Sequence, residues 1–296
     1  MLIRIGIAFL AALALSGQVR KLHTRDLTRL SHLQVAEQLK KSDVIFVPVG
    51  AVETNGIQPS DRDYVFALGL ATAMAEETGG LFMPGLAWSY PGTTLPAPST
   101  IGFKIGSGSA FLKETAHSLL RQGFRRQVYI SMSHGPAALT VGSMIREFFD
   151  ETRVPLLYVN LDEYFPKIKV VPAERDKFLY GAHWITGRID DLALKGEYGE
   201  TPHASIQPNE GLAKLGKLGF TGSFYLGSWI NDVMAHGGSG NLPATAAERE
   251  SWGKAGEAQI RAVVKRMRLN EGMDALREHD RYTQDVIVPR LKEWVR

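Results

Sequence analysis

Along most of the chain, segments with a strand-like pattern of apolar residues alternate with segments that have a helical pattern. Residues 44–49 form a nearly continuous apolar run rich in β-branched side chains, and residues 127–132 read as a second buried strand. Residues 64–78 instead place apolar side chains at helical spacing and end at two glycines. The full pattern predicts helices over residues 33–41, 64–78, 109–121, 137–150, 244–269 and 273–294, and strands over residues 44–49, 81–84, 127–132 and 154–160.

Alternating strands and helices imply repeated βαβ units. Their crossover helices cover both faces of a mostly parallel sheet, so the pattern predicts an α/β fold of three layers, α/β/α. Residues 85–108 and 167–240 are less regular, with many glycines and few clear periods. No repeat, low-complexity tract or linker interrupts residues 18–296, and we expect them to form a single domain.

The first 17 residues have the layout of a secretory signal peptide. A short basic start is followed by an apolar stretch over residues 5–15 and by the small-x-small pattern Ala14-Leu15-Ser16. The apolar stretch is too short to span a membrane, and no stop-transfer segment follows it. We therefore expect export to the periplasm or secretion, with no membrane contact in the mature form. The alternative is a buried N-terminal element of the domain, which would leave the protein cytoplasmic.

The amino-acid composition limits the kinds of partner and catalytic chemistry that the protein can have. The chain has 44% hydrophobic and 22% charged residues, and its formal charge of +3 is too small to indicate a nucleic-acid partner. It has no cysteine, which excludes disulfides, thiolate metal sites and a cysteine nucleophile. Glu, Asp and His are left as the side chains able to bind a metal.

Polar residues gather directly after the strand at residues 44–49. Glu53 and Asn55 begin the following loop, and Asp61 and Asp63 end it. In open α/β sheets, ligands and metals bind outside the carboxyl ends of the strands, so these carboxylates are candidates for catalysis or metal binding. Glu53 could instead cap the next helix or pair with an arginine, and Asn55 could stabilise the turn.

Three further segments complete an ordered set of motifs. They are the loop segment Tyr90-Pro91-Gly92-Thr93, the strand end Ser131-Met132-Ser133-His134-Gly135, and the pair of Gly219-Phe220-Thr221-Gly222 with Leu242-Pro243-Ala244-Thr245. In this order and spacing, residues 28–270 resemble the creatininase (creatinine amidohydrolase) family. The resemblance implies a creatininase-like parallel α/β fold, a hexamer, and two divalent metals, zinc or manganese. It also implies opening of a small cyclic or linear amide by a metal-activated water.

Carried over by position, the resemblance makes Glu53, Asp63 and His134 the ligands of the first metal. Asp63 takes the bridging place, although one residue is missing between Glu53 and Asp63 relative to the family pattern. We expect Asp61 to assist as a general base, because both side chains of an extended Asp-x-Asp point the same way. Glu53, Asp61 and His134 are thus the expected catalytic residues.

The chain departs from the family pattern on one side of the site. Asn55 and Pro136 replace both ligands of the second metal, and Gln58 and Ala87 replace two further histidines. Later in the chain only His183 and Thr186 match the expected segment, and Arg188 stands where that segment has a glutamate. These replacements favour one metal per chain, or none. The expected substrate pocket consists of Asn55, Trp88, Tyr90 and His183, although Trp88 and Tyr90 could simply pack the loop, and His183 could be structural.

Two functional hypotheses follow. The first is an exported amidohydrolase with one zinc or manganese ion, acting on a small molecule and forming a homo-oligomer. The alternative is a metal-free descendant that binds a small molecule, or catalyses a non-hydrolytic reaction, with Asn55, Tyr90 and His134 as polar groups. A third option is a purely structural subunit of an oligomer.

Overall fold

The computed structural model describes residues 22–85, 99–132, 135–198, 210–219 and 241–294. The expected signal peptide and the residues Trp88, Tyr90 and His134 lie outside this part of the chain. Within it, no helix is long and apolar enough to cross a membrane.

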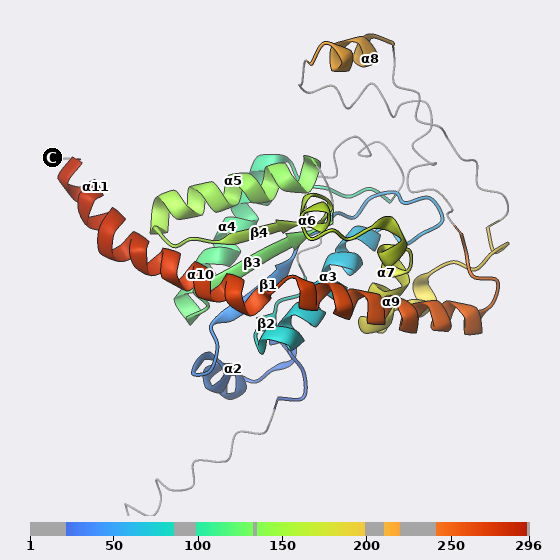
Figure 1. Ribbon diagram of the computed structural model, residues 1–296, viewed down its shortest axis with the longest axis horizontal. Coiled ribbons are helices and arrows are strands. Elements are labelled where there is room, and N and C mark those ends of the chain that lie inside the picture. Colours follow the sequence, from blue (N-terminus) through green and yellow to red (C-terminus); the bar gives the residue numbers. More distant parts are fainter. Residues whose placement is uncertain (1–21, 86–98, 133–134, 199–209, 220–240, 295–296) are drawn as a thin grey trace, which may run out of the picture.

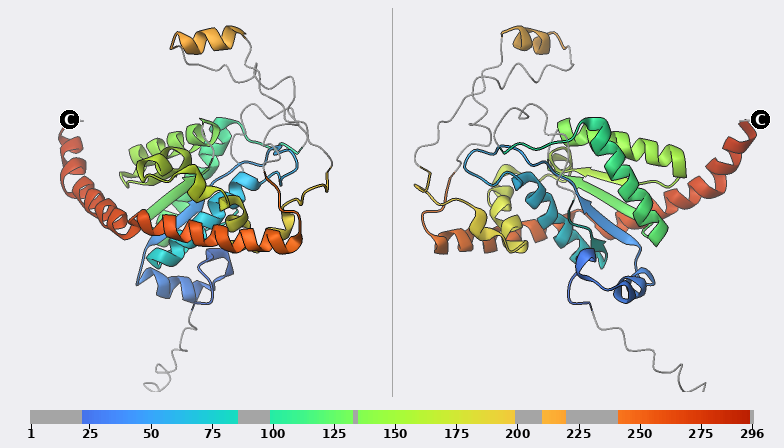
Figure 2. Two further views of the ribbon diagram at one scale, coloured as in Figure 1. Left: turned by 45° about the vertical axis from the view of Figure 1, so that its right-hand side comes forward. Right: turned by 180° about the vertical axis from the view of Figure 1, so that it is seen from behind.

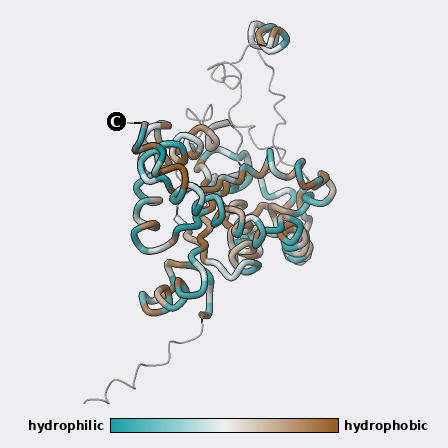
Figure 3. The backbone as a smooth tube through the Cα atoms, turned by 60° about the vertical axis from the view of Figure 1, so that its left-hand side comes forward, coloured by the Kyte–Doolittle hydropathy of each residue, from teal (hydrophilic) through white to brown (hydrophobic). Residues whose placement is uncertain are grey.

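A four-stranded parallel sheet forms the centre of the molecule, in the order β2-β1-β3-β4. Strand β1 (Val44–Pro48) pairs with β2 (Leu81–Phe82) on one side and with β3 (Arg126–Ser131) on the other, and β4 (Leu157–Asn160) completes the sheet. Every residue of β1 is buried, as its apolar, β-branched sequence predicts. Figure 3 shows hydrophobic backbone at the centre of the molecule, where the strands lie.

Helices cover both faces of the sheet (Figure 1, Figure 2). On one face α3 (Arg62–Thr78), α7 (Phe178–Ile185), α9 (Ala246–Arg266) and α10 (Leu269–Tyr282) enclose a core that includes Phe46. On the other face α4 (Ile105–Gln122) and α5 (Gly135–Thr152) enclose a second core with Ile45 and Val47. The predicted three-layer α/β/α fold with a parallel sheet is therefore confirmed.

Two glycines allow α7 and α9 to cross in close contact. A Cβ atom on Gly181 would overlap the backbone of Gly256, and one on Gly256 would overlap Gly181 in return. On its other side α7 approaches α3, where Gly69 faces Ala182. Helix α7 is therefore fixed between two long helices, and it carries His183.

The edge of the sheet beside β2 is covered by residues that precede the first helix. Asp26 forms a parallel bridge with Phe82, and the Phe82 amide donates to the carbonyl of Arg25 at 3.0 Å. The Arg25 guanidinium donates to the Gly79 carbonyl at 2.8 Å, at the end of α3. Helix α2 (His32–Leu39) then begins with a capping box.

Several elements differ from the sequence expectation. The region over residues 167–240, predicted to be irregular, contains α7 and α8 (Glu210–Lys217), and α6 (Leu161–Lys167) directly precedes it. The strand expected over residues 154–160 is shorter, because β4 begins only at Leu157. The last predicted helix is divided into α10, the π-helical segment η7 (Thr283–Ile287) and α11 (Val288–Trp294). Helix α11 projects from the body of the molecule (Figure 1, Figure 2).

Candidate active site

The sheet topology places a ligand crevice at the carboxyl ends of β1 and β3. From β1 the chain moves to β2 on one side and then returns to β3 on the other, so the strand order reverses between β1 and β3. Ligands of open α/β sheets bind at such a reversal. The Val49 amide donates to the Ile130 carbonyl at 2.8 Å and holds the two strand ends together.

The loop after β1 folds back on itself at this point. The Glu53 amide donates to the Ser60 carbonyl at 2.9 Å, and the Thr54 amide donates to Thr100 Oγ1 at 3.0 Å. A Cβ atom on Gly50 would overlap Tyr64, so only glycine allows the loop to pass the start of α3. The Glu53 side chain is only 6% exposed, which places a buried carboxylate beside the strand reversal.

Asn55 is the most buried polar side chain of this loop, at 1% exposure. Its amide nitrogen faces three backbone carbonyls, those of Glu53, Pro59 and Ser60, at 3.3, 3.4 and 3.3 Å. The interpretation of Asn55 as a turn-stabilising residue is therefore confirmed. Its Oδ1 atom has no hydrogen-bond partner among the described residues.

Asp61 forms a two-point ion pair with Arg188, which follows α7. Arg188 Nη1 and Nη2 donate to the two carboxylate oxygens at 2.6 and 3.1 Å, and its Nε donates to Asp191 at 2.7 Å. The hydrogen bonds that Arg188 donates to Asp61 raise the pKa of Arg188 further above its usual value. The guanidinium therefore stays charged and is shared between two carboxylates.

His183 is fully buried on α7, and its tautomer follows from its contact. Its Nδ1 lies 2.9 Å from the carbonyl of Leu179, which can only accept, so Nδ1 carries the proton. Nε2 keeps its lone pair and has no hydrogen-bond partner in the described part of the chain. Burial lowers the pKa of His183 to about 4, and nearby Arg188 acts in the same direction. His183 is thus a neutral acceptor within the electrostatic range of Asp61.

Asp63 lies in the first turn of α3, where a carboxylate is favoured by the helix dipole, and it pairs with Arg62 at 3.4 Å. Asp61 is the residue before the helix. The premise that Asp61 and Asp63 share an extended segment is wrong, because helix α3 begins between them. The carbonyl of Asp61 already accepts a helical bond from Val65.

The side chains of the described loop that could bind a metal offer oxygen atoms as donors. Among the described residues, no group of three or more His, Asp or Glu side chains is arranged to hold a metal. His134, the expected imidazole ligand, lies outside those residues. Glu53, Asp63 and Asn55 offer carboxylate and amide oxygens, which are donor types that hard divalent cations prefer. Asp63 is paired with Arg62, and Asp61 is paired with Arg188.

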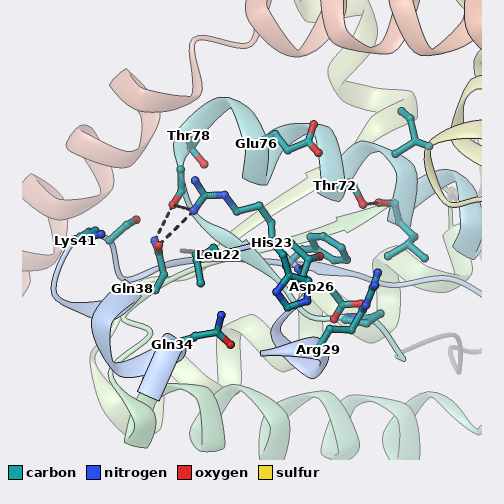
Figure 4. Close-up of a pocket in the computed structure, with 18 of the residues that line it drawn as sticks. Leu22, His23, Asp26, Arg29, Gln34, Gln38, Lys41, Thr72, Glu76 and Thr78 are labelled. Atoms are coloured by element: carbon teal, nitrogen blue, oxygen red, sulfur yellow. Dashed lines mark hydrogen bonds between the residues drawn. The ribbon is translucent and has the colours of Figure 1, made fainter. Parts of the chain in front are cut away.

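A large cavity of about 1230 Å³ lies elsewhere, between the residues around Asp26, helix α2 and helix α3 (Figure 4). Gln34, Gln38, Thr72 and Thr78 are among its lining residues, and none of the expected site residues is. The carboxyl-terminal ends of α2 and α3 face this cavity, and Arg25 and Gln38 already bind the part-buried Gly79 carbonyl. We therefore place the candidate active site at the strand reversal rather than here.

Comparisons with known proteins identify the family of this chain. The family model described as creatininase, creatinine amidohydrolase, matches residues 28–205 of this chain. The chain belongs to the creatininase family. The matched range contains β1, the loop with Glu53 and Asn55, and helix α3 with Asp63.

Solved creatininase structures share the fold at low sequence identity. A mutant creatininase of Zn-Zn type is 15% identical, with a TM-score of 0.55 over 82% of this chain and 98% of that chain. A creatininase structure with Mn in its description is 16% identical, with a TM-score of 0.53 over 82% and 98%. A putative creatinine amidohydrolase from Bacteroides fragilis is 20% identical, with a TM-score of 0.52 over 82% and 95%.

The 3-dehydro-scyllo-inosose hydrolase of Thermotoga maritima is a relative of this chain and has an assigned activity. The two sequences are 27% identical over 133 residues, which is 44% of this chain and 42% of the relative. The match thus spans less than half of the relative's length.

Proposed function

We propose that this protein is a metal-dependent amidohydrolase that hydrolyses a C–N bond in a small cyclic or linear amide, with one metal rather than two. The observation that carries the proposal is the buried Glu53 carboxylate at the strand reversal, in a chain of the creatininase family. Carboxylates are metal donors, and Glu53 lies where ligands of open α/β sheets bind.

Glu53 and Asp63, with His134, would hold the metal. A divalent metal at this position lowers the pKa of a water molecule and polarises the carbonyl of the substrate. Asp61 is the proton acceptor in this proposal, and Arg188 fixes the orientation of its carboxylate through two hydrogen bonds. His183 would accept a hydrogen bond from the substrate through Nε2.

The names of the solved structures, creatininase and creatinine amidohydrolase, support an amide substrate. The name of the Thermotoga maritima relative, 3-dehydro-scyllo-inosose hydrolase, supports hydrolysis but not an amide. A neutral histidine and buried amide oxygens supply acceptors, which fit a small ring that bears N–H or O–H groups.

The second candidate is a metal-free protein that binds a small molecule or catalyses a non-hydrolytic reaction in the same crevice. The pairing of Asp61 with Arg188 favours it, because a guanidinium already supplies positive charge beside the loop.

Metal analysis combined with an activity screen separates the two candidates. Purified protein is stripped with a chelator, reloaded with Zn²⁺ or Mn²⁺, and tested on a panel of lactams and cyclic ureides. We expect about one metal per chain, and loss of both metal and hydrolysis in Glu53→Gln and His134→Ala. Less than about a tenth of a metal per chain after loading would refute the hydrolase and favour the metal-free protein.

A further inference from the structure

The cavity between the segment around Asp26, helix α2 and helix α3 has no part in the proposed function (Figure 4). Its volume of about 1230 Å³ exceeds the roughly 300–1000 Å³ that is typical of ligand pockets, so a whole small molecule fits inside it. Charged side chains reach it from the segment before α2, from α2 and the turn that follows it, and from α3. The kind of ligand that it suits follows from the charges that the protein leaves unpaired.

The Arg25 guanidinium is held at this cavity by one of its nitrogen atoms. Nη1 donates to the Gly79 carbonyl at 2.8 Å, at the end of α3, and to Gln38 Oε1 at 3.3 Å. Nε and Nη2 form no hydrogen bond within the described part of the chain. These two nitrogens share one edge of the planar guanidinium, and such an edge binds two oxygens of a carboxylate or phosphate. The contact with α3 therefore leaves this edge of Arg25 open for a ligand.

Arg29 and Lys41 are two further cations that line the cavity. Figure 4 shows Lys41 near Gln38 and Arg29 near Asp26. The Lys41 amide donates to the Gln38 carbonyl at 2.9 Å, which places Lys41 one turn from the side chain that contacts Arg25. None of the three lining cations forms an ion pair with a carboxylate of the described residues.

Two of the three carboxylates that line the cavity are neutralised by cations outside it. Glu37 pairs with Lys40, and Glu76 pairs with Arg261 at 2.6 Å, and neither of these cations lines the cavity. Within the described part of the chain, the third carboxylate, Asp26, has no cationic partner.

The lining therefore carries a surplus of positive charge. Three unpaired cations against one unpaired carboxylate leave two positive charges. Helices α2, α3 and α7 end at this cavity, and the end of each helix contributes about half a negative charge, which offsets part of the surplus but not all of it. The charge balance thus favours an anionic ligand over a neutral or cationic one.

We propose that this cavity binds a small molecule that carries a phosphate or carboxylate group, with the open edge of Arg25 and the ammonium group of Lys41 as its anchors. Thr72 and Thr186 also line the cavity, and their hydroxyl groups donate to helix carbonyls, so their oxygens remain acceptors for the rest of the ligand. Hydroxyl groups on the ligand suit these acceptors. The site is separate from the candidate active site and does not depend on the proposed function.

Isothermal titration calorimetry of the full-length protein tests the site with two probes, inorganic phosphate and succinate, at constant ionic strength. We expect saturable binding of at least one probe, with one site per chain. Arg25→Lys should weaken this binding by about tenfold or more, because lysine keeps the charge but lacks the edge with two nitrogens. Lys41→Gln should weaken it by about twofold to fivefold, because one nearby charge is lost.

Arg153→Gln provides the matched control. Arg153 Nη1 also donates to a carbonyl near the end of a helix, that of Phe149 in α5 at 3.4 Å, but Arg153 does not line the cavity. Its replacement should leave both affinities within about 1.5-fold of the original. Circular dichroism checks that each variant is folded. The Lys41 side chain forms no hydrogen bond or ion pair with the described residues, so Lys41→Gln tests the site even where Arg25→Lys does not fold.

The outcomes identify the ligand class or overturn the proposal. Binding of phosphate alone identifies a phosphate-bearing ligand, binding of succinate alone a carboxylate-bearing one, and comparable binding of both a site that accepts either group. Unchanged affinity in Arg25→Lys or, where that variant does not fold, in Lys41→Gln overturns the proposal. Absence of binding of both probes up to about 10 mM overturns it as well. Neither of these results affects the proposed function, whose residues do not line this cavity.

Discussion

Arg188 places a positive charge beside the carboxylate of Asp61 in the candidate site. It lies 127 positions after Asp61 in the sequence and bonds both oxygens of its carboxylate. Both side chains are partly exposed, at 34% and 26%, so solvent weakens their attraction. The two hydrogen bonds partly offset this loss of attraction, because one ordered guanidinium makes both of them.

We predict a measurable coupling between Asp61 and Arg188. Urea unfolding of Asp61→Asn, Arg188→Gln and the double variant should give a coupling free energy of about 1 kcal/mol, reduced at high salt. The exposed pair of Glu37 and Lys40 serves as the comparison and should give no more than about 0.5 kcal/mol. Equal values for both pairs would contradict the prediction.

From the burial of His183 we predict that folding stability depends on pH. Because its pKa falls from 6.5 to about 4 on folding, the unfolded chain takes up a proton in this range and the folded chain does not. Stability is therefore complete above pH 6.5 and decreases as the pH falls from 6.5 to 4, by up to about 3 kcal/mol. His183→Leu should show a correspondingly flatter curve in urea unfolding, whereas the exposed His279→Gln should keep the original slope. Parallel curves for the original protein and His183→Leu would show that burial does not suppress this charge.

The pattern of an apolar strand followed by a polar loop makes Glu53 and Asp63 candidates, and the resemblance makes them metal ligands, which stays a prediction. The structure buries Glu53 in the loop that follows β1. The ion pair of Asp61 with Arg188 could not be predicted, since contacts between distant positions leave no local pattern. The start of α3 was placed two residues late, which led to the incorrect extended geometry for Asp61 and Asp63.

At the scale of elements, the strands are predictable as short, nearly continuous apolar runs, and the long helices are predictable from their helical period. Helix α7 was not, because its sequence Phe-Leu-Tyr-Gly-Ala-His-Trp-Ile is apolar on nearly all sides and only eight residues long. Such a segment is buried between other helices, here α3 and α9, and periodicity does not reveal it.

The crossing of α7 and α9 predicts unequal effects of two Gly→Ala substitutions. Gly181→Ala should destabilise the protein by about 2–3 kcal/mol, because the new methyl group overlaps the α9 backbone. Gly272→Ala on α10 meets no atom within 4 Å and should be neutral or stabilising by up to about 1 kcal/mol. Thermal unfolding of both variants measures the difference, and a stable Gly181→Ala would show that the two helices can separate without cost.

At the scale of the whole molecule, the surface supports the proposal of a homo-oligomer. Ile101, Phe103 and Phe111 are exposed, and the two phenylalanine rings lie 6.5 Å apart. Clustered apolar side chains of this kind mark interaction surfaces.

We predict a molar mass of several times 32.6 kDa by light scattering at micromolar concentration. Phe111→Glu should shift the protein toward the monomer, because it buries a charge in the proposed interface. Leu218→Glu, at an exposed leucine on another part of the chain, serves as the control and should not. A monomer in the original protein would refute the proposal.

The bridge between Asp26 and Phe82 has a consequence for the solubility of shortened chains. The family match begins at residue 28, yet residues 25 and 26 occupy the hydrogen-bonding edge of β2. A chain cut at residue 28 would keep every described α-helix and strand and would still present an open strand edge to its neighbours. Open edges of this kind recruit further strands from other molecules. Residues 25 and 26 thus prevent the edge of β2 from pairing with strands of other molecules.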